Sequence, residues 1–307
     1  SFSVIINEGF KNRYTKLLHN LDQQPWSLLK NSINQNCHNN NHICEFNKLS
    51  TKEVIVIGDS HLSILSFDLK TKVVHKDYKF ISSTNDGCIY IPNFNRVDKN
   101  KKIDKRCNKK YFKEIKKRLK KSNGSIIILG GRFPKYLRNN YFDNKEGGVE
   151  GNEYSYNFIN DMQDNKFENE FINEVKKLSN KNYIILIYPI PEVGFNVPEK
   201  IRQMYYEDSN LLNKNIEDEN FLTTSYEVYL ERSKSSFELF DKIDSKNIFR
   251  VYPHKLFCNT IKKDRCLTHN NEYIFYSDDD HPSIKGAELI NNLILKKLND
   301  IEKRNAY

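Results

Sequence analysis

Residues 54–61 read Val-Ile-Val-Ile-Gly-Asp-Ser-His, an apolar run that ends in a short polar turn. Four consecutive β-branched residues bounded by glycine predict a buried strand. Leu62, Leu65 and Leu69 follow at the spacing of one helix face, which places Ser60 at a strand-to-helix turn. In open α/β sheets such turns lie at the carboxyl edge, where ligands bind, and the first N–H groups of the helix can support negative charge. Ser60 is therefore a candidate nucleophile.

A second polar cluster, Asp278-Asp-Asp-His281, lies near the other end of the chain. The three-residue spacing is about one helical turn, so the carboxylate of Asp278 can orient the imidazole of His281. Serine, histidine and aspartate are the parts of a nucleophilic acyl-transfer site, and we expect Ser60, His281 and Asp278 to be catalytic. We interpret Asp279 and Asp280 as a solvated acidic lead into the last helix. We expect no bound metal, although a metal site in this cluster stays open as an alternative.

The composition is that of a folded domain, with 307 residues of which 38% are hydrophobic and 12% aromatic. The formal net charge is +9, but the lysines are mixed with acids and no arginine-rich arm is present. This pattern favours a solvated lysine surface, and we expect no nucleic-acid partner. No apolar run approaches the ~20 residues that span a bilayer. The chain begins with Ser1 and shows no signal peptide, so we expect a processed product or an excised domain.

Predicted strands and helices alternate along most of the chain. Apolar runs predict strands at 54–58, 72–81, 125–130, 183–188 and 248–252. Helical patterns occupy 62–69, 109–121, 167–178, 221–243 and 284–301. The alternation predicts an α/β fold, a three-layer α/β/α flavodoxin-like parallel sheet. We expect residues 1–50 to form a linker or small N-terminal extension and residues 51–307 to form the catalytic domain. The polar segments 131–165 and 189–220 follow strands and are expected to be substrate loops.

The six cysteines form three local couples, Cys37 with Cys44, Cys88 with Cys107, and Cys258 with Cys266. Six thiols allow many connectivities, so this pairing is a hypothesis. Two alternatives stay open: a zinc site built from Cys37, Cys44 and the histidines at 38 and 42, or unpaired buried thiols. Disulfides would place the chain outside the cytosol.

The two polar clusters together resemble the nucleophile block and the terminal block of the SGNH (GDSL-like) hydrolase family. The resemblance rests on Gly-Asp-Ser60 and on Asp278-x-x-His281. It implies that Ser60 attacks an ester carbonyl. His281 would take the serine proton and later give it to the leaving alcohol, while Asp278 holds His281 in the correct tautomer.

The same resemblance implies an oxyanion hole formed by Ser60, by Gly87 and by a residue of the family's third block. That block normally contains asparagine, but this chain has Gly130-Gly-Arg132 after the strand at 125–130. Losing one oxyanion donor can slow an enzyme ~100-fold or more, so the departure matters. Arg132 is expected to replace the amide donor, to bind a substrate carboxylate, or to be a surface cation.

A narrower resemblance covers the chain from about residue 37 to the C-terminus. It rests on His61 after Gly-Asp-Ser, Gly87-Cys88, the aromatic segment after Arg132, Pro-Ile-Pro-Glu-Val-Gly at 189–194, the couple Cys258 and Cys266, and Tyr276-x-Asp-Asp-Asp-His281. These features are similar to the SGNH domain fused behind the membrane domain of acyltransferase-3 family proteins. Those proteins O-acetylate bacterial surface polysaccharides.

This second resemblance implies a serine-dependent O-acyltransferase that forms an acyl-Ser60 intermediate and passes the acyl group, expected to be acetyl, to a polysaccharide. The domain itself would need no cofactor, because the membrane domain would present the acyl donor. It would lie in the periplasm or another extracytoplasmic space, tethered to the inner membrane. Two alternatives stay open: a carbohydrate acetylesterase with the same triad, and a non-catalytic glycan-binding module, which the missing asparagine favours.

Overall fold

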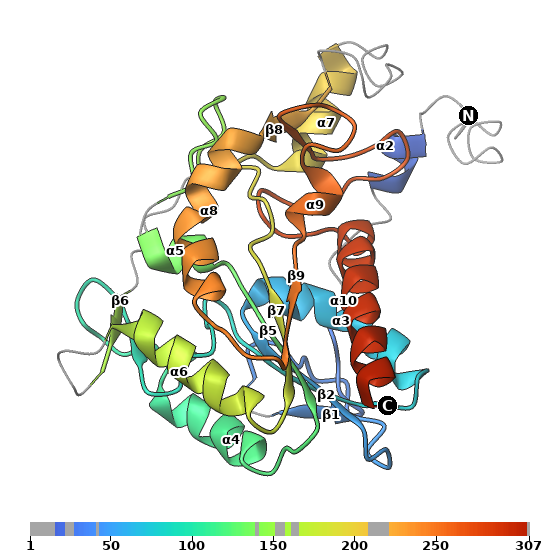
Figure 1. Ribbon diagram of the computed structural model, residues 1–307. Helices are drawn as coiled ribbons and strands as arrows, with labels where there is room; N and C mark the ends of the chain where they lie inside the picture. Colours follow the sequence, from blue (N-terminus) through green and yellow to red (C-terminus); the bar gives the residue numbers. More distant parts are fainter. Residues whose placement is uncertain are drawn as a thin grey trace.

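The computed structural model describes residues 16–21, 28–40, 43–138, 141–150, 157–160, 166–207 and 221–305. At its centre lies a six-stranded sheet with the order β1-β3-β2-β5-β7-β9 (Figure 1). The strands are β1 (Cys44–Phe46), β2 (Glu53–Gly58), β3 (Lys79–Thr84), β5 (Ile126–Leu129), β7 (Tyr183–Ile187) and β9 (Ile248–Val251). β2, β3, β5, β7 and β9 are parallel, whereas β1 pairs antiparallel with β3. The parallel strands have the flavodoxin-like order, and the predicted fold class is confirmed.

Helices cover both faces of the sheet and complete the three layers (Figure 1). α3 (Ser60–Val74) and α10 (Ile284–Asn305) lie on one face, and α4 (Lys109–Leu119), α6 (Phe167–Ser179) and α8 (Tyr226–Asp241) lie on the other. Val54 and Val56 pack with the α3 and α10 layer, and Ile55 and Ile57 pack with the opposite layer. Because both faces of β2 are buried, its sequence is a continuous apolar run rather than an alternating one.

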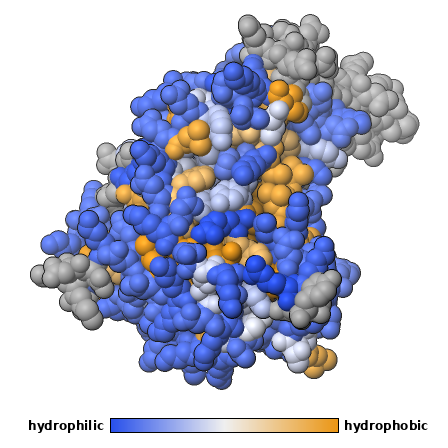
Figure 2. All heavy atoms as spheres, in the orientation of Figure 1, coloured by the Kyte–Doolittle hydropathy of each residue, from blue (hydrophilic) through white to orange (hydrophobic). Residues whose placement is uncertain are grey.

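Shorter elements decorate the carboxyl edge and the periphery. The helices are α2 (Lys16–Leu21), α5 (Phe133–Arg138), α7 (Val197–Glu207) and α9 (His254–Phe257). Two small antiparallel sheets pair β4 (Asn95–Val97) with β6 (Asn157–Ile159), and β8 (Thr223–Ser225) with β10 (Arg265–Leu267). The face shown in Figure 2 is largely hydrophilic. In the described part of the chain, no helix has the length and apolarity that crossing a membrane requires.

Several elements differ from the sequence-based predictions. The strand predicted at 72–81 begins only at Lys79, because α3 continues to Val74. The helix predicted from 221 begins at Tyr226, because the preceding residues form β8. The segments expected to be loops contain α5, β6 and α7, although residues 139–140, 151–156, 161–165 and 208–220 lie outside the described part of the chain.

The N-terminal region also contributes to the sheet domain. β1 pairs with β3, and Leu29, Cys37 and Cys44 are buried in the core. The described part of the segment expected to be a linker or N-terminal extension therefore packs on the sheet domain. Residues 1–15 and 22–27 lie outside the described part of the chain.

All three cysteine couples are disulfides in the structure. The bond between Cys37 and Cys44 contradicts the zinc alternative, since a disulfide sulfur is no longer a thiolate ligand. His42, the fourth residue of that alternative, lies outside the described residues. The alternative of unpaired buried thiols is also contradicted, because no cysteine is free.

Candidate active site

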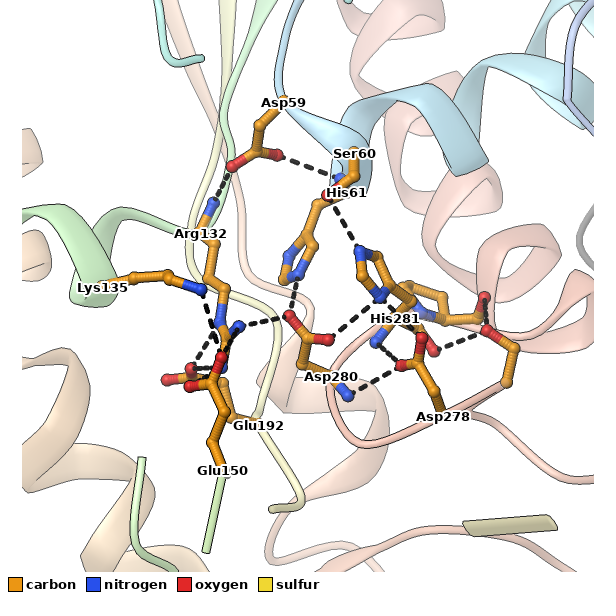
Figure 3. Close-up of polar contacts among 12 residues, drawn as sticks. Asp59, Ser60, His61, Arg132, Lys135, Glu150, Glu192, Asp278, Asp280 and His281 are labelled. Atoms are coloured by element: carbon orange, nitrogen blue, oxygen red, sulfur yellow. Dashed lines mark hydrogen bonds and ion pairs between the residues drawn. The ribbon is translucent and has the colours of Figure 1, made fainter. Parts of the chain in front are cut away.

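The structure brings Ser60 and His281 together although 221 positions separate them in the sequence (Figure 3). Ser60 is the first residue of α3, and His281 lies in the loop that leads into α10. Packing of α10 beside α3 places the Oγ of Ser60 2.8 Å from the Nε2 of His281. On the other side of the ring, the Nδ1 of His281 lies 2.8 Å from the Oδ2 of Asp278. The three residues form a continuous hydrogen-bonded chain with the geometry that an activated serine needs.

Asp278 is held in place by its own loop. Its Oδ1 accepts hydrogen bonds from the backbone N–H groups of Asp280, at 3.0 Å, and of His281, at 2.7 Å. One carboxylate oxygen therefore closes the turn while the other faces the imidazole. The local sequence Asp-x-x-His is enough to build this half of the site.

Asp280 provides a second carboxylate to the same imidazole. Its Oδ1 lies 2.9 Å from the Nδ1 of His281, and its Oδ2 lies 3.0 Å from the Nε2 of His61. The same Oδ2 is 2.9 Å from the Nη1 of Arg132. The Asp280 side chain is 4% exposed, against 30% for Asp278. The expectation that Asp280 is solvated is wrong, because two imidazoles and a guanidinium surround it.

The paired carboxylates control the charge of His281. Burial lowers the pKa of His281, but the charges of Asp280 and Asp278 and their hydrogen bonds outweigh it and raise the pKa above its usual 6.5. Burial likewise raises the pKa of Asp280, whereas Arg132 and His281 hold it well below the usual range of an aspartate. Asp280 is therefore an anion that stabilises the imidazolium form of His281.

Asp59 anchors the turn that carries the serine. Its side chain caps α3 by accepting a hydrogen bond from the N–H of His61 at 3.0 Å. Its second oxygen accepts from the N–H of Arg132 at 2.7 Å and from the hydroxyl of Tyr136 at 3.1 Å. Asp59 thus joins the carboxyl ends of the neighbouring strands β2 and β5. A Cβ on Gly58 would lie 2.7 Å from the carbonyl oxygen of Gly130, so this junction requires glycine.

Arg132 is the centre of a buried ion-pair network (Figure 3). Its Nε donates to Glu192 at 2.6 Å, and its two Nη atoms donate to Glu150 at 2.9 Å each. Its Nη atoms also contact Asp280 at 2.9 Å and Glu192 at 2.5 Å. A guanidinium has five N–H groups, and the hydrogen bonds to Glu192 and Glu150 use three of them. Burial raises the pKa of Glu192, yet Arg132 and Arg232 lower it overall, so the network stays ionised.

The structure contradicts one of the three roles expected for Arg132, that of a surface cation, because Arg132 is 8% exposed. Its backbone N–H donates to Asp59, and its guanidinium is paired with three carboxylates. Arg132 thus compensates the charge of Asp280 and connects it to Glu150 and Glu192. Arg132 also lines the cavity at Ser60, and its roles as an oxyanion donor or as a partner of a substrate carboxylate stay predictions.

Two other predicted oxyanion donors face a cavity beside the serine. The cavity has a volume of about 390 Å³, and its lining includes Ser60, Gly87 and His281. Within the described ranges, the backbone N–H groups of Ser60 and Gly87 have no acceptor in the protein. Both residues are half-buried, so their N–H groups are available to a ligand in the cavity, and two such donors beside a nucleophile fit a place where an oxyanion binds.

Among the residues that the structure describes, two clusters have donor atoms close enough for a metal ion. Ligand atoms of His61, Asp280 and His281 lie within 4.8 Å of one another, and so do those of the three consecutive aspartates from Asp278. Asp280 belongs to both clusters, and the guanidinium of Arg132 already compensates its charge. The donor set therefore fits a hydrogen-bonded ion-pair network better than it fits a cation site.

Several side chains of the site had no role in the sequence-based interpretation: His61, Glu150, Glu192, Tyr136 and Arg232. The signal for Glu192 was present, since a lone acid in the apolar run Tyr188-Pro-Ile-Pro-Glu-Val predicts a buried charge with a partner. Glu150 and Arg232 gave no such signal, because each lies in a polar stretch and meets the network only in the folded chain.

Comparisons with known proteins show the family to which this sequence is similar. The family model described as "SGNH domain (fused to AT3 domains)" matches residues 31–296. The periplasmic domain of a lipopolysaccharide acetyltransferase from Salmonella ser. Paratyphi A has a similar fold, with a TM-score of 0.50 and 19% identity over 80% of this chain and 83% of that one. A G-D-S-L lipolytic protein from Veillonella parvula aligns with a TM-score of 0.38 and 11% identity over 80% of this chain and 97% of the other. No match was found among curated protein sequences.

Proposed function

Because the chain belongs to the family of SGNH domains fused to AT3 domains, we propose that it is a serine-dependent O-acyltransferase acting on a polysaccharide hydroxyl. The observation that carries the proposal is the hydrogen-bonded chain from Ser60 through His281 to Asp278, which opens on a cavity with two unpaired backbone N–H groups. This combination supplies a nucleophile, a base and a place for an oxyanion.

The reaction has two half-steps. The Oγ of Ser60 attacks the acyl carbonyl of the donor while His281 takes the serine proton and passes it to the departing group. A hydroxyl of the acceptor then attacks the acyl-Ser60 ester while His281 removes its proton. The bond between the acyl carbon and the Oγ of Ser60 breaks, and His281 returns the proton to that Oγ. In each half-step the N–H groups of Ser60 and Gly87 bind the oxyanion, and the carboxylates of Asp278 and Asp280 stabilise the imidazolium that forms.

The family pairs this domain with an AT3 domain, and we propose that the AT3 domain presents the acyl donor. The site then needs no cofactor, since nucleophile, base and oxyanion donors all come from the chain. We further propose a bacterial surface polysaccharide as the acceptor, acetyl as the acyl group, and a periplasmic position beside the inner membrane. The three disulfides support an oxidising compartment.

Labelling with a fluorophosphonate, followed by turnover of an aryl acetate with and without a sugar acceptor, tests the proposal. We expect wild type to be labelled, Ser60→Ala to lose labelling completely, and His281→Ala to be labelled far more slowly. Ser32→Ala and His75→Ala are matched controls, because both residues are exposed and neither lines the cavity.

The products separate the three functions. Acetyl found on the sugar supports the transferase. Acetate release alone, with a range of sugar acceptors, supports a carbohydrate acetylesterase that uses the same triad with water. A folded wild-type protein that is not labelled contradicts both enzymes and supports a glycan-binding module.

A further inference from the structure

In the loop of residues 85–88, one backbone N–H is unpaired among the described residues and the other three have acceptors. The N–H of Asp86 donates to the Oδ1 of Asn39 at 2.8 Å, and the N–H of Cys88 donates to the carbonyl of Asn85 at 3.1 Å. The carbonyls of Asp86 and Gly87 both accept from the Nη1 of Arg96, the former at 2.7 Å. In the described chain the N–H of Gly87 has no such partner, and Gly87 lines the cavity at Ser60.

Arg96 determines the direction of this N–H through peptide geometry. The carbonyl of Asp86 and the N–H of Gly87 belong to one peptide group, and in a trans peptide they point in opposite directions. When Arg96 binds the carbonyl, the N–H is held on the opposite side. Arg96 is 1% exposed, and its Nη2 is fixed by Asp104 at 2.6 Å. The guanidinium is thus a rigid partner for the carbonyl.

Asn39 holds the same loop from the other side. Besides accepting the N–H of Asp86, it donates its Nδ2 to the Oδ2 of Asp86 at 2.6 Å. His38, its neighbour, lies 2.6 Å from the Oδ1 of Asp86. The hydrogen bond from His38 lowers the pKa of Asp86 to about 2, although burial opposes the shift. Asp86 is therefore ionised, and its carboxylate binds His38 and Asn39, which lie in the loop closed by the disulfide between Cys37 and Cys44.

On the basis of the acyl transfer proposed above, we propose that Asn39 and Arg96 are positioning residues that hold the Gly87 N–H toward the reacting carbonyl oxygen. Neither residue acts on the substrate through this contact. Each fixes a peptide group of the loop 85–88, so that the oxyanion donor is already oriented when the acyl group arrives. The donor needs no reorganisation during the reaction, which is where such sites gain their rate.

Asn39→Gly is the most selective test. Asn39 has φ +57°, a conformation that glycine adopts without strain. The variant therefore removes the side chain and its hydrogen bonds without straining the backbone. Asn34→Gly is its matched control, because Asn34 is exposed, has φ +60° and does not contact the loop. Arg96→Lys is a second variant, since lysine keeps the charge but loses the rigid fork.

We expect Asn39→Gly to lower kcat for an aryl acetate about tenfold with KM nearly unchanged, less than the ~100-fold loss of a whole oxyanion donor. The 31P chemical shift of the phosphonyl-Ser60 adduct should also move, because the Gly87 N–H no longer binds the phosphonyl oxygen in one orientation. Asn34→Gly should match wild type in both measurements, and Arg96→Lys should follow Asn39→Gly.

The outcomes distinguish this proposal from the proposed function. A wild-type protein that forms no adduct contradicts the acyl transfer itself. An adduct in every variant, with the wild-type kcat and chemical shift in Asn39→Gly and Arg96→Lys, contradicts the positioning role while leaving the transferase intact. A purely structural role would lower the melting temperature without moving the chemical shift of the adduct, and that result also overturns the proposal.

Discussion

The turn at 58–61, which carries the proposed nucleophile, and the loop at 85–88, which carries a proposed oxyanion donor (the oxyanion loop), both contribute to the cavity lining, but different parts of the chain hold them. In the turn, Asp59 caps the helix that Ser60 begins, so the motif supplies its own anchor. In the loop, the anchors are Asn39 and Arg96, with the disulfide from Cys88 to Cys107 beside them. A nucleophile can be specified by a local motif, whereas the donor opposite it depends on segments that meet only after folding.

Gly87→Ala should break the oxyanion loop with the largest effect. Gly87 has φ +59°, and an added Cβ would lie 1.9 Å from the Nη1 of Arg96, so both the peptide and the arginine must move. We expect kcat for an aryl acetate to fall about 100-fold, as for the loss of one oxyanion donor.

Gly124→Ala is the matched control for that variant. Gly124 has a similar φ of +69°, but an added Cβ would meet no atom within 4 Å. It should lose a little stability and keep its activity. Equal activities of the two variants would show that the loop 85–88 does not contribute to turnover.

Removing the disulfide between Cys88 and Cys107 should have the next largest effect. The bond joins residues 19 positions apart, and its loss in Cys88→Ala with Cys107→Ala should lower the free energy of unfolding by about 3 kcal/mol. The backbone N–H of Arg96 donates a hydrogen bond to the carbonyl of Cys107. Loss of the disulfide should therefore disturb Arg96 and the orientation of the Gly87 N–H, and we expect kcat to fall about tenfold.

Replacing Cys258 and Cys266 in the same way provides the comparison. That bond closes a shorter loop at β10, away from the cavity, so denaturation should show a loss of stability while kcat stays near wild type. If both double variants lost the same fraction of kcat, the special connection between the first disulfide and the oxyanion loop would be refuted.

Asp280→Asn should give the smallest effect of the three. It concerns the base beside Ser60, and it should change how the activity depends on pH. His281 acts as a base only when neutral, and Asp280 raises its pKa, so in wild type the activity should rise as the pH increases through that raised value. Without the anion the pKa falls, and the rising limb of the kcat/KM profile should move to lower pH by about one unit or more.

Asp244→Asn removes an exposed carboxylate and should leave the profile in place. The quantity to compare is the pH at which the rising limb of the kcat/KM profile lies, because a loss of stability alone would not shift that pH. A profile of Asp280→Asn that coincides with wild type would show that Asp278 alone sets the pKa of His281.

Much of the fold was predictable because its signals are local. The runs at β2, β5, β7 and β9 are short, apolar and bounded by turn residues, and burial on both faces makes such runs distinct from helices. β1 was missed because three residues, Cys-Glu-Phe, form no recognisable pattern, and only pairing with β3 makes them a strand. The start of β3 was misplaced because the apolar residues Val73 and Val74 fit a helix as well as a strand.

The site divides in the same way. Ser60, Asp278 and His281 were found from short motifs and a family resemblance, and the structure places them within hydrogen-bond distance. The surroundings of Asp280 and Arg132 were not predicted, because they come from distant elements. An acidic residue beside other acids looks solvated until an arginine from another strand end is placed against it.

The sequence by itself determined the parallel sheet, the serine at its carboxyl edge, the local Asp-x-x-His turn and the cysteine couples, since each depends on residues near one another in the chain. Only the tertiary structure decided that Asp280 joins Asp278 at His281, that Arg132 pairs with the carboxylates, and that Asn39 and Arg96 bind the backbone of Asp86 beside Gly87. The physical reason is that a buried charge or peptide group takes its partner from whatever packs against it, and that neighbour is fixed by the fold.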